Sequence, residues 1–367
     1  MINTINQQRT PLGVVAVALI ALSAPVQAVD FGAFGNIRYL SSNQDATPQG
    51  FMLGVFDLYA AHQIGDKTRA FVEYVMEGKG NEIVTDVERL FVARTFSDKF
   101  MLAAGRFHTP IGFWNNVYHH GALLQDTVDR PRFLDFEDGA GAILPTHTVG
   151  LMANGKFDAG HVSVGYDLAV GNGTSINTDH PTASRALEVN NSGDPNPSKA
   201  VVMRLGIEPE NSSVKLGVST VFNHIPEAGK AQAQGVAYGG TLVAQRIFAV
   251  DVKLEMNKFD VLAEAYRFSN ENKTGTAKKH SASAYFAQFG YRLTEDCKVV
   301  YRHENVSFEA DDEYFKILQR EKYRQNLLAL RMDVDDSNAL KFEVDRQRNT
   351  ISVDETRVVV QWEFLIP

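Results

Sequence analysis

The sequence predicts an all-β protein: a transmembrane antiparallel β-barrel of about sixteen strands, with short turns at one end and long loops at the other. Three observations predict it. Segments of alternating apolar and polar residues recur along the chain, tight turns alternate with longer polar connectors, and no segment after residue 28 approaches the run of about 20 apolar residues that a membrane helix needs. Any insertion into a membrane must therefore use strands, closed into a barrel so that no edge stays unpaired.

Residues 1–28 differ from the rest of the chain. They begin with a cationic N-terminus and Arg9, continue through an apolar run at 12–22 and end on Val26-Gln27-Ala28, which has the form of a cleavage site. This order is typical of a cleavable secretory signal peptide. A membrane anchor is the alternative, but the run is too short for a bilayer core of about 30 Å. We expect 1–28 to be a signal peptide and 29–367 to form a single barrel.

Each candidate strand is a stretch of apolar or aromatic alternation bounded by Gly, Asn, Asp, Pro or Ser. The candidates lie near 31–40, 51–64, 68–78, 85–96, 99–109, 146–157, 160–171, 199–208, 213–224, 240–256, 259–269, 281–293, 297–308, 323–334, 338–348 and 355–366. The same pattern also accommodates fourteen or eighteen strands. An even number is the firmer prediction.

The connectors sort into two classes that alternate along the chain. Tight turns are expected at 65–67, 97–98, 158–159, 209–212, 257–258, 294–296 and 335–337. The connectors between them, mostly longer and polar, are expected at 40–50, 79–84, 110–145, 172–198, 225–239, 270–280, 309–322 and 349–354. If both chain ends lie on one side of the membrane, every tight turn falls on that side, which is typical of outer-membrane barrels. A β-sandwich is not expected to place its tight turns at one end and its longer connectors at the other.

Alternation within the strands predicts which residues face the interior. In 248–256 every second residue is apolar, from Phe248 to Met256, and the residues between them include three charged side chains. Charges cannot face lipid in mid-strand, so they belong to a polar inner wall. The predicted wall residues are Arg69, Glu73, Arg94, Arg106, Asp251, Lys253, Glu255, Lys341 and Glu343, with Arg89 as a further candidate. Arg346 is expected on the lipid face, and the pattern is ambiguous in 85–96, where both faces are apolar.

The longest connector, 110–145, is rich in residue types that line functional sites. Its candidates are Trp114, Asn116, His119, His120, Asp126, Asp129, Arg130, Arg132, Asp135, Glu137 and Asp138. A connector of this length is usually functional or disordered, and its aromatic content disfavours disorder. It holds five acids and two arginines. Opposite the arginines of the wall, this charge would produce a transverse field and favour cations or dipolar solutes. The alternative is that the charges only keep an external loop soluble.

The sequence predicts neither a cofactor nor a metal site. His119 and His120 invite a metal-binding interpretation together with His108 and His147, but adjacent side chains on an extended segment point in opposite directions. The acidic run at 135–141 lacks the spacing of a calcium loop. The formal net charge of −8 disfavours a nucleic-acid partner, and one cysteine excludes an intrachain disulfide.

Several features together resemble a known family. A signal peptide, about sixteen strands, a dominant third external loop and a last strand that runs from Glu355 to Phe364 look like the trimeric porins of Gram-negative bacteria. Residues 105–112, Gly-Arg-Phe-His-Thr-Pro-Ile-Gly, are similar to the Gly-x-Phe-x-x-Pro-φ-Gly motif of the phosphate-selective porin-like group. The resemblance implies a location in the bacterial outer membrane, a homotrimer and a third loop folded into the lumen.

The chain departs from this family at two points. Such barrels typically end on an aromatic residue, whereas this chain continues past Phe364 to Leu365-Ile366-Pro367. A phosphate-selective pore is expected to present a basic ladder in its third loop, and this loop is acidic.

The function that we expect from the sequence is a water-filled channel for the passive diffusion of small hydrophilic solutes or ions. Its expected partners are outer-membrane lipid, those solutes and two further copies of the chain. One alternative is a non-conducting barrel that acts as a binding or scaffold protein. Another is a barrel-embedded hydrolase, although no serine and histidine lie at matching spacing on one outward strand.

Overall fold

A computed structural model describes residues 29–79, 81–119, 121–135, 142–177, 186–189, 193–194, 198–226, 240–275 and 277–366. The signal peptide predicted at 1–28 lies outside the described residues, as do His120, Glu137 and Asp138. Among the described residues, no helix is long and apolar enough to cross a membrane.

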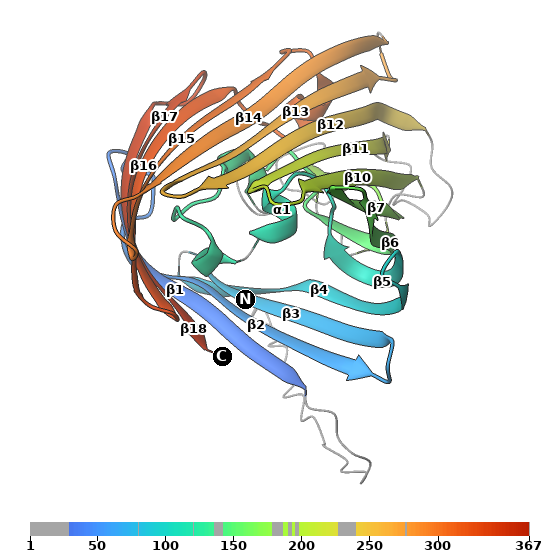
Figure 1. Cartoon of the computed structure of the whole chain (residues 1–367). Coiled ribbons are helices and arrows are strands. Elements are labelled where there is room, and N and C mark those ends of the chain that lie inside the picture. The colour runs from blue at the N-terminus through green and yellow to red at the C-terminus, as the bar shows by residue number, and fades with distance from the viewer. Residues whose placement is uncertain are drawn as a thin grey trace, which may run out of the picture.

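Sixteen antiparallel strands form a closed barrel (Figure 1). They are β1 (Asp30–Ser42), β2 (Gly50–Ile64), β3 (Thr68–Lys79), β4 (Glu82–Ser97), β5 (Phe100–His108), β6 (His147–Ala159), β7 (Val162–Asn172), β10 (Lys199–Pro209), β11 (Val214–Pro226), β12 (Thr241–Met256), β13 (Phe259–Asn272), β14 (Lys278–Arg292), β15 (Cys297–Phe308), β16 (Tyr323–Asp335), β17 (Asn338–Asn349) and β18 (Glu355–Ile366). Each strand pairs with its neighbours in the chain, and β1 closes the ring against β18.

The structure confirms the predicted fold, including the number of barrel strands and their positions. The seven tight turns lie at one end of the barrel, where β1 begins and β18 ends, because Ala33 pairs with Ile366. Three connectors were predicted too long, because the strands on either side extend toward each other: 40–50 reduces to 43–49, 79–84 to 80–81 and 270–280 to 273–277. The connector 172–198 contains an unpredicted pair of short strands, β8 (Ser175–Asn177) and β9 (Ala186–Glu188), which pair with each other.

The outer face of the barrel is apolar. Large apolar side chains alternate along the strands and are exposed, among them Leu58, Leu151, Phe248, Phe342 and Trp362. A water-soluble protein rarely exposes so large a continuous apolar surface. The residues between them point inward and include most of the buried charged side chains. Apolar side chains therefore face outward and charged side chains inward, which is the opposite of their distribution in a soluble β-sandwich.

A β-bulge in β4 explains the ambiguous pattern at 85–96. Glu73 of β3 pairs with Arg89, whereas the next residue, Tyr74, pairs with Val87, so Glu88 has no residue opposite it on β3. The extra residue reverses the alternation. As a result Val87 and Leu90 both face outward, while Glu88 is buried on the lumen side.

The reversal also corrects the prediction for Arg94. This residue was expected on the inner wall, but it shares the face of Leu90 and Val92, which are 57% and 48% exposed. Its guanidinium lies 5.8 Å from the ring of the exposed Phe96. Arg346 lies on the exposed outer face, as predicted.

A row of glycines crosses β5, β6 and β7 in register, where Gly105 pairs with Gly150 and Gly150 with Gly171. Gly105 has a φ of 140°, and a Cβ there would lie 2.1 Å from the carbonyl oxygen of Leu90. The pairing of β4 with β5 extends from Ser97 to Leu90, which pairs with Arg106. The Arg106 side chain donates to the Glu88 carbonyl of β4 at 3.0 Å. The end of β5 and the beginning of β6, which lead into the long connector, therefore lie against the lumen side of β4.

Candidate functional site

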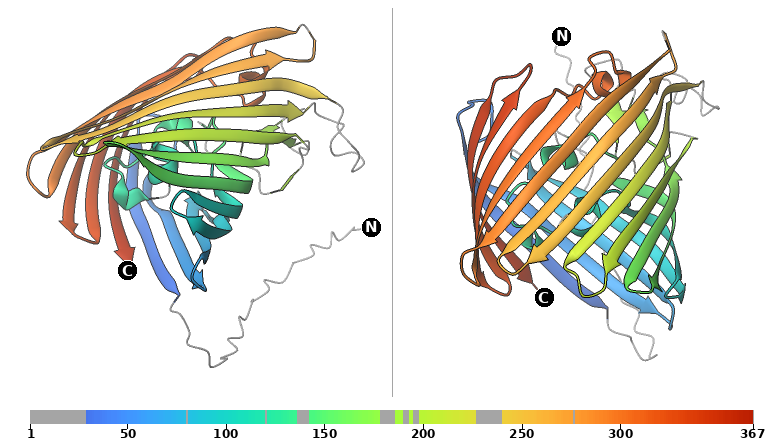
Figure 2. Two further views of the ribbon diagram at one scale, coloured as in Figure 1. Left: turned by 45° about the vertical axis from the view of Figure 1, so that its right-hand side comes forward. Right: turned by 45° about the horizontal axis from the view of Figure 1, so that its top comes forward.

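The connector between β5 and β6 folds into the barrel. It carries α1 (Trp114–Val117) and two 3-10 turns, η1 (Ala122–Leu124) and η2 (Arg132–Leu134). Figures 1 and 2 show α1 inside the ring of strands from different directions. We call the described residues of this connector, 109–119, 121–135 and 142–146, the inner loop. We call β10–β18 the loop-bound wall, because most of the loop's described contacts are with these strands, and β2–β4 the opposite wall.

An apolar core joins the inner loop to the loop-bound wall. Trp114 is 1% exposed and packs edge-to-face on Phe286 of β14, with ring centroids 5.6 Å apart. Phe133 is fully buried and packs on Tyr266 of β13 at 5.5 Å. The same core includes Phe315 from α2 (Glu313–Ile317). Inward apolar residues of this wall thus bind the loop instead of lining water.

Polar groups in and beside α1 are held by side chains of the wall. The Glu264 carboxylate on β13 accepts a hydrogen bond from the Trp114 amide at 2.6 Å. The Gly112 amide donates to Ser219 Oγ at 3.3 Å, and Lys253 Nζ donates to the Tyr118 hydroxyl at 2.9 Å. A Cβ at Gly112 would lie 2.1 Å from the Tyr266 hydroxyl. The loop therefore meets β11, β12 and β13 at van der Waals distance, which requires the glycine.

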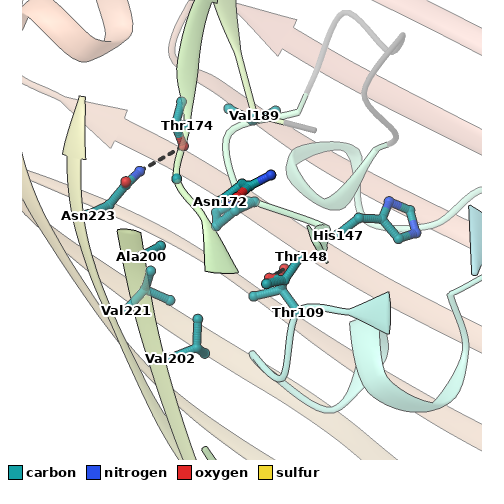
Figure 3. Close-up of a pocket in the computed structure, with 12 residues that line it drawn as sticks. Thr109, His147, Thr148, Asn172, Thr174, Val189, Ala200, Val202, Val221 and Asn223 are labelled. Atoms are coloured by element: carbon teal, nitrogen blue, oxygen red, sulfur yellow. Dashed lines mark hydrogen bonds between the residues drawn. The ribbon is translucent and has the colours of Figure 1, made fainter. Parts of the chain in front are cut away.

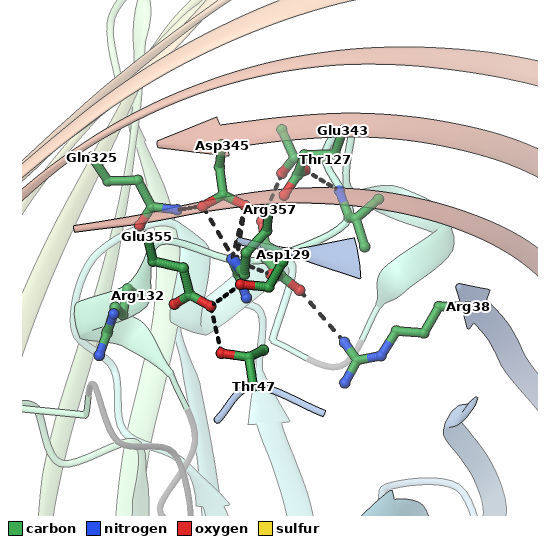
Figure 4. A network of polar contacts seen from close by, with 12 residues as sticks. Arg38, Thr47, Thr127, Asp129, Arg132, Gln325, Glu343, Asp345, Glu355 and Arg357 are labelled. Atoms are coloured by element: carbon green, nitrogen blue, oxygen red, sulfur yellow. Dashed lines mark hydrogen bonds and ion pairs between the residues drawn. The ribbon is translucent and has the colours of Figure 1, made fainter. Parts of the chain in front are cut away.

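Ion pairs fix the second half of the loop. Asp126 binds Lys298 of β15 at 2.8 Å, and Asp129 lies between Arg357 of β18 at 2.8 Å and Arg38 of β1 at 3.5 Å (Figure 4). Burial alone would raise the pKa of Asp129, but the nearby arginines, Arg357 first, outweigh it and hold the pKa below the usual 3.8. Asp129 is therefore charged at neutral pH, when the ion pairs form.

The backbone of the same segment is also bound. Arg302 of β15 donates to Thr127 Oγ1 at 2.8 Å and to the Asp129 carbonyl at 2.9 Å. Glu343 of β17 accepts from the Val128 amide at 2.7 Å. The neighbouring Lys341 donates to the Thr127 carbonyl at 3.1 Å. The Val128 amide and the Thr127 carbonyl thus have hydrogen-bond partners on the wall, while the Asp129 carbonyl also accepts from Thr127 Oγ1 at 2.9 Å within the loop.

The opposite wall presents a different inner surface. Tyr59, Phe71 and Phe91, on three successive strands, stack with ring centroids 6.5 and 5.4 Å apart. The Arg89 guanidinium lies 4.5 Å from the Phe71 ring and pairs with Glu73. The rings are partly exposed although they point inward, so the solvent that reaches them lies in the lumen. This wall meets the loop at Glu88, beside His119.

Two cavities adjoin the inner loop. One of about 280 Å³ lies toward the tight turns, between Tyr118 and Asp126 of the loop and Lys253, Lys298 and Arg331 of the wall. The other, of about 10 Å³, is comparable to one water molecule. Figure 3 shows its lining between the base of the loop and β7, β10 and β11, with Asn223 donating to Thr174 at 2.7 Å.

The structure places the predicted loop residues in different roles. Trp114 is buried against the wall and does not line a pore, whereas Asp126 and Asp129 are held by ion pairs. Arg132 stacks over Tyr323 at 5.6 Å. Asn116 donates to the Gly112 carbonyl within the loop, and Arg130 and Asp135 are partly exposed.

The predicted wall residues also have different roles: some are bound within the wall or hold the loop, and others face the lumen. Asp251 is bound by Arg204, with one contact at 2.9 Å, and Lys341 pairs with Glu363 at 2.8 Å. Lys253 and Glu343 hold the loop. Arg69 pairs with the inward Ala93 and is exposed, so it faces the lumen, and Glu255, further along the chain from Lys253, is also exposed.

Sequence reasoning missed most of the cations that bind the loop. It named arginines of β3 to β5 as the partners of the acidic loop, but the cations in contact with Asp126 and Asp129 are Lys298, Arg38 and Arg357. Arg38 lies between the exposed Ile37 and Tyr39, and Arg357 precedes the exposed Val358. That alternation was the available signal for an inward position.

The histidines are also arranged differently from the sequence expectation. A metal site was not expected, because the adjacent side chains of His119 and His120 would point in opposite directions on an extended segment. In the structure His108, His119 and His147 come together instead, each with a ring nitrogen within 4.8 Å of the others.

No family model matches the sequence, and no curated protein matches it either. Solved structures do match in fold. The anion-selective porin from Comamonas acidovorans has a TM-score of 0.60 at 11% identity, over 92% of this chain and 99% of that chain. The outer membrane channel DcaP of Acinetobacter baumannii has a TM-score of 0.60 at 9% identity, over 92% and 97%. OmpF of Salmonella typhi, in complex with daunomycin, has a TM-score of 0.54 at 12% identity, over 92% and 97%. At these identities the similarity shows the fold alone.

Proposed function

We propose that this protein is an outer-membrane channel through which small hydrophilic solutes or ions diffuse passively. The observation that carries the proposal is the combination of an apolar outer face with an inner face whose charged and aromatic side chains reach solvent inside the barrel. Arg69, Phe71 and Arg89 lie on that inner face. A wall with lipid on one side and water on the other requires this distribution.

The inner loop is the proposed constriction. It occupies the lumen beside the loop-bound wall and leaves the stacked rings of the opposite wall accessible to solvent. A barrel of sixteen strands would otherwise hold a wide aqueous channel. Passage is therefore expected between the loop and the wall that carries Tyr59, Phe71 and Arg89.

The remaining parts of the proposal rest on the sequence. Residues 1–28 would direct export, the chain would lie in the bacterial outer membrane with its tight turns on the periplasmic side, and three copies would associate. Association as a trimer is supported by the resemblance to trimeric porins. The phosphate preference of the porin-like group is not carried over, because the inner loop is acidic and the two glycines of the 105–112 segment have a structural role: Gly105 and Gly112 both have positive φ.

Single-channel recording tests the proposal. The purified protein, folded in detergent and added to a planar lipid bilayer, should produce discrete, long-lived conductance steps that scale with salt concentration. Protein of verified fold that inserts into the bilayer and gives no conductance above background would contradict it.

A second candidate function is a non-conducting barrel that binds a partner through its long loops. The apolar core between Trp114, Phe133 and the wall favours it, because it fills part of the lumen permanently. The same recording separates the two functions: the second predicts inserted protein without conductance.

A further inference from the structure

Three histidines from separate segments meet where the inner loop begins and ends. His108 is the last residue of β5, His119 follows α1, and His147 is the first residue of β6. Their ring centroids lie 4.0 Å (His108–His119), 4.6 Å (His119–His147) and 5.3 Å (His108–His147) apart. His119 and His147 are each 3% exposed, whereas His108 is partly exposed and leaves a route from solvent.

A carboxylate completes the cluster. Glu88 Oε2 lies 2.7 Å from His147 Nε2 and 3.6 Å from His119 Nε2. Glu88 is 3% exposed and is the residue that the β4 bulge turns toward the lumen. β-Bulges beside functional sites commonly change the direction in which a side chain points.

The hydrogen bonds of Asn115 fix the orientation of His119. The Asn115 amide nitrogen donates to the carbonyls of Thr109 and Thr146, at 2.8 and 3.0 Å. Its oxygen therefore faces His119 Nδ1, 2.8 Å away, and this ring nitrogen must donate. In the neutral ring Nε2 then carries the lone pair, on the side of Glu88. Metal-binding histidines are oriented in this way by a partner of their second nitrogen.

We propose that His108, His119, His147 and Glu88 bind one divalent transition-metal ion of the zinc class. Three imidazoles and one carboxylate are donors that zinc accepts in four-coordinate sites. Zn–N bonds of about 2.0–2.1 Å place the ligand atoms of a tetrahedral site about 3.4 Å apart. The histidine nitrogens, within 4.8 Å of one another, reach this spacing by side-chain adjustment.

Charge supports a cation at this point. A lone pair of His119 directed toward a carboxylate is unfavourable unless positive charge lies between them. A proton on the ring or a metal ion could supply that charge, and the convergence of the His108 and His147 nitrogens to within 4.8 Å of His119 is the observation that favours the metal ion. The bound ion would hold both ends of the inner loop to β4.

Binding of Zn²⁺ and Co²⁺ to the full mature barrel tests the proposal. The protein should carry no polyhistidine tag and should be treated with a chelator and then freed of it. Calorimetry with Zn²⁺ should give one site per chain, and Co²⁺ should give the intense visible absorption of a tetrahedral complex. Wild-type protein that shows neither signal would overturn the proposal, whatever the variants do.

The variants locate the ion. His119→Ala, His147→Ala and Glu88→Gln should each weaken Zn²⁺ binding by roughly tenfold or more. His161→Ala is the matched control, because its side chain is 97% exposed in the turn after β6, and it should bind like wild type. Unchanged affinity in variants whose barrel fold is verified by circular dichroism would place the ion elsewhere and overturn the proposal.

Discussion

The two sides of the lumen differ in what their inward side chains contact. On the loop-bound wall, inward residues such as Phe286, Glu264 and Arg302 are buried against the inner loop. On the opposite wall, Phe71 and Arg89 also point inward but remain partly exposed to solvent. The same period-two alternation produces both surfaces, so the difference arises from the path of the loop.

The lumen therefore has a packed half, filled by the inner loop, and a solvent-filled half beside the opposite wall. Substitutions on the loop-bound wall should change stability and the position of the loop. Substitutions on the opposite wall should change the passage of ions with little effect on stability. The following predictions test that division.

Removing the loop should have the largest effect. Deletion of 115–140, closed by a short Gly-Ser linker, is expected to raise single-channel conductance roughly twofold or more, because η1, η2 and most of α1 then no longer occupy the lumen. The linker need not span a long gap, since His108 and His147 are paired. Conductance equal to that of wild type would reject the loop as the constriction.

Trp114→Ala should detach α1 from the wall. Loss of a buried aromatic side chain costs about 3–5 kcal/mol, and the loop should become sensitive to protease and the channel noisy. Thermal unfolding, monitored by circular dichroism, measures the loss of stability. Limited proteolysis measures the sensitivity of the loop. Val117→Ala is the matched control on the same helix, because Val117 is 47% exposed. Equal sensitivity of the two variants would contradict the packed-half description.

Arg357→Gln should release one side of Asp129. Arg357 also pairs with Asp345 of β17 at 3.0 Å, and the Asp345 side chain is only 1% exposed. A hydrogen bond to a charged group contributes about 1.5–3 kcal/mol, and loss of the arginine beside this buried carboxylate places the expected loss of stability at the upper end. Among the described residues Asp129 then keeps only Arg38 as an ion-pair partner, so the reversal potential should also shift toward cation preference. Arg346→Gln on the outer face should change neither quantity, and a shift toward anions in Arg357→Gln would refute the charge assignment.

Acid should act on the same pair. Because arginines lower the pKa of Asp129 in the folded protein, its carboxylate stabilises the loop at every pH above its unfolded pKa of about 3.9 and loses that contribution as pH falls through the lower folded value. Conductance controlled by this ion pair should be constant from about pH 7 to 5 and change only below about pH 4. The acid-induced change should be smaller in Asp129→Asn. A wild-type change above pH 5 that Asp129→Asn abolishes would contradict the assignment.

The smallest effect is expected from Arg69→Gln. Arg69 is exposed on the lumen side, so its neutralisation should shift the reversal potential slightly toward cations and leave stability within about 0.5 kcal/mol. Arg94→Gln, on the neighbouring strand but on the outer face, is the matched control and should leave the reversal potential unchanged. Equal shifts in both variants would show that the assignment of faces is wrong.

Local pattern was sufficient for most of the fold. The limits of β15 and β18 are close to those expected from alternation and turn residues, because one-sided burial leaves a period of two in the sequence. Arg94 was misplaced because the bulge at Glu88 inserts one residue without any distinctive composition. Beyond the bulge the alternation continues in the opposite phase, which a single sequence does not reveal.

For the candidate site, the sequence determined the inward face of the regularly alternating strands and which loop is long enough to enter the lumen. The tertiary structure decided which of them meet. Alternation specifies a face but neither the height of a side chain in the barrel nor its partner across the lumen. Asp129 and Arg357 are 228 residues apart, and Glu88, His108, His119 and His147 come from four segments. Such contacts depend on closing the barrel and folding the loop inside it, and no local pattern encodes them.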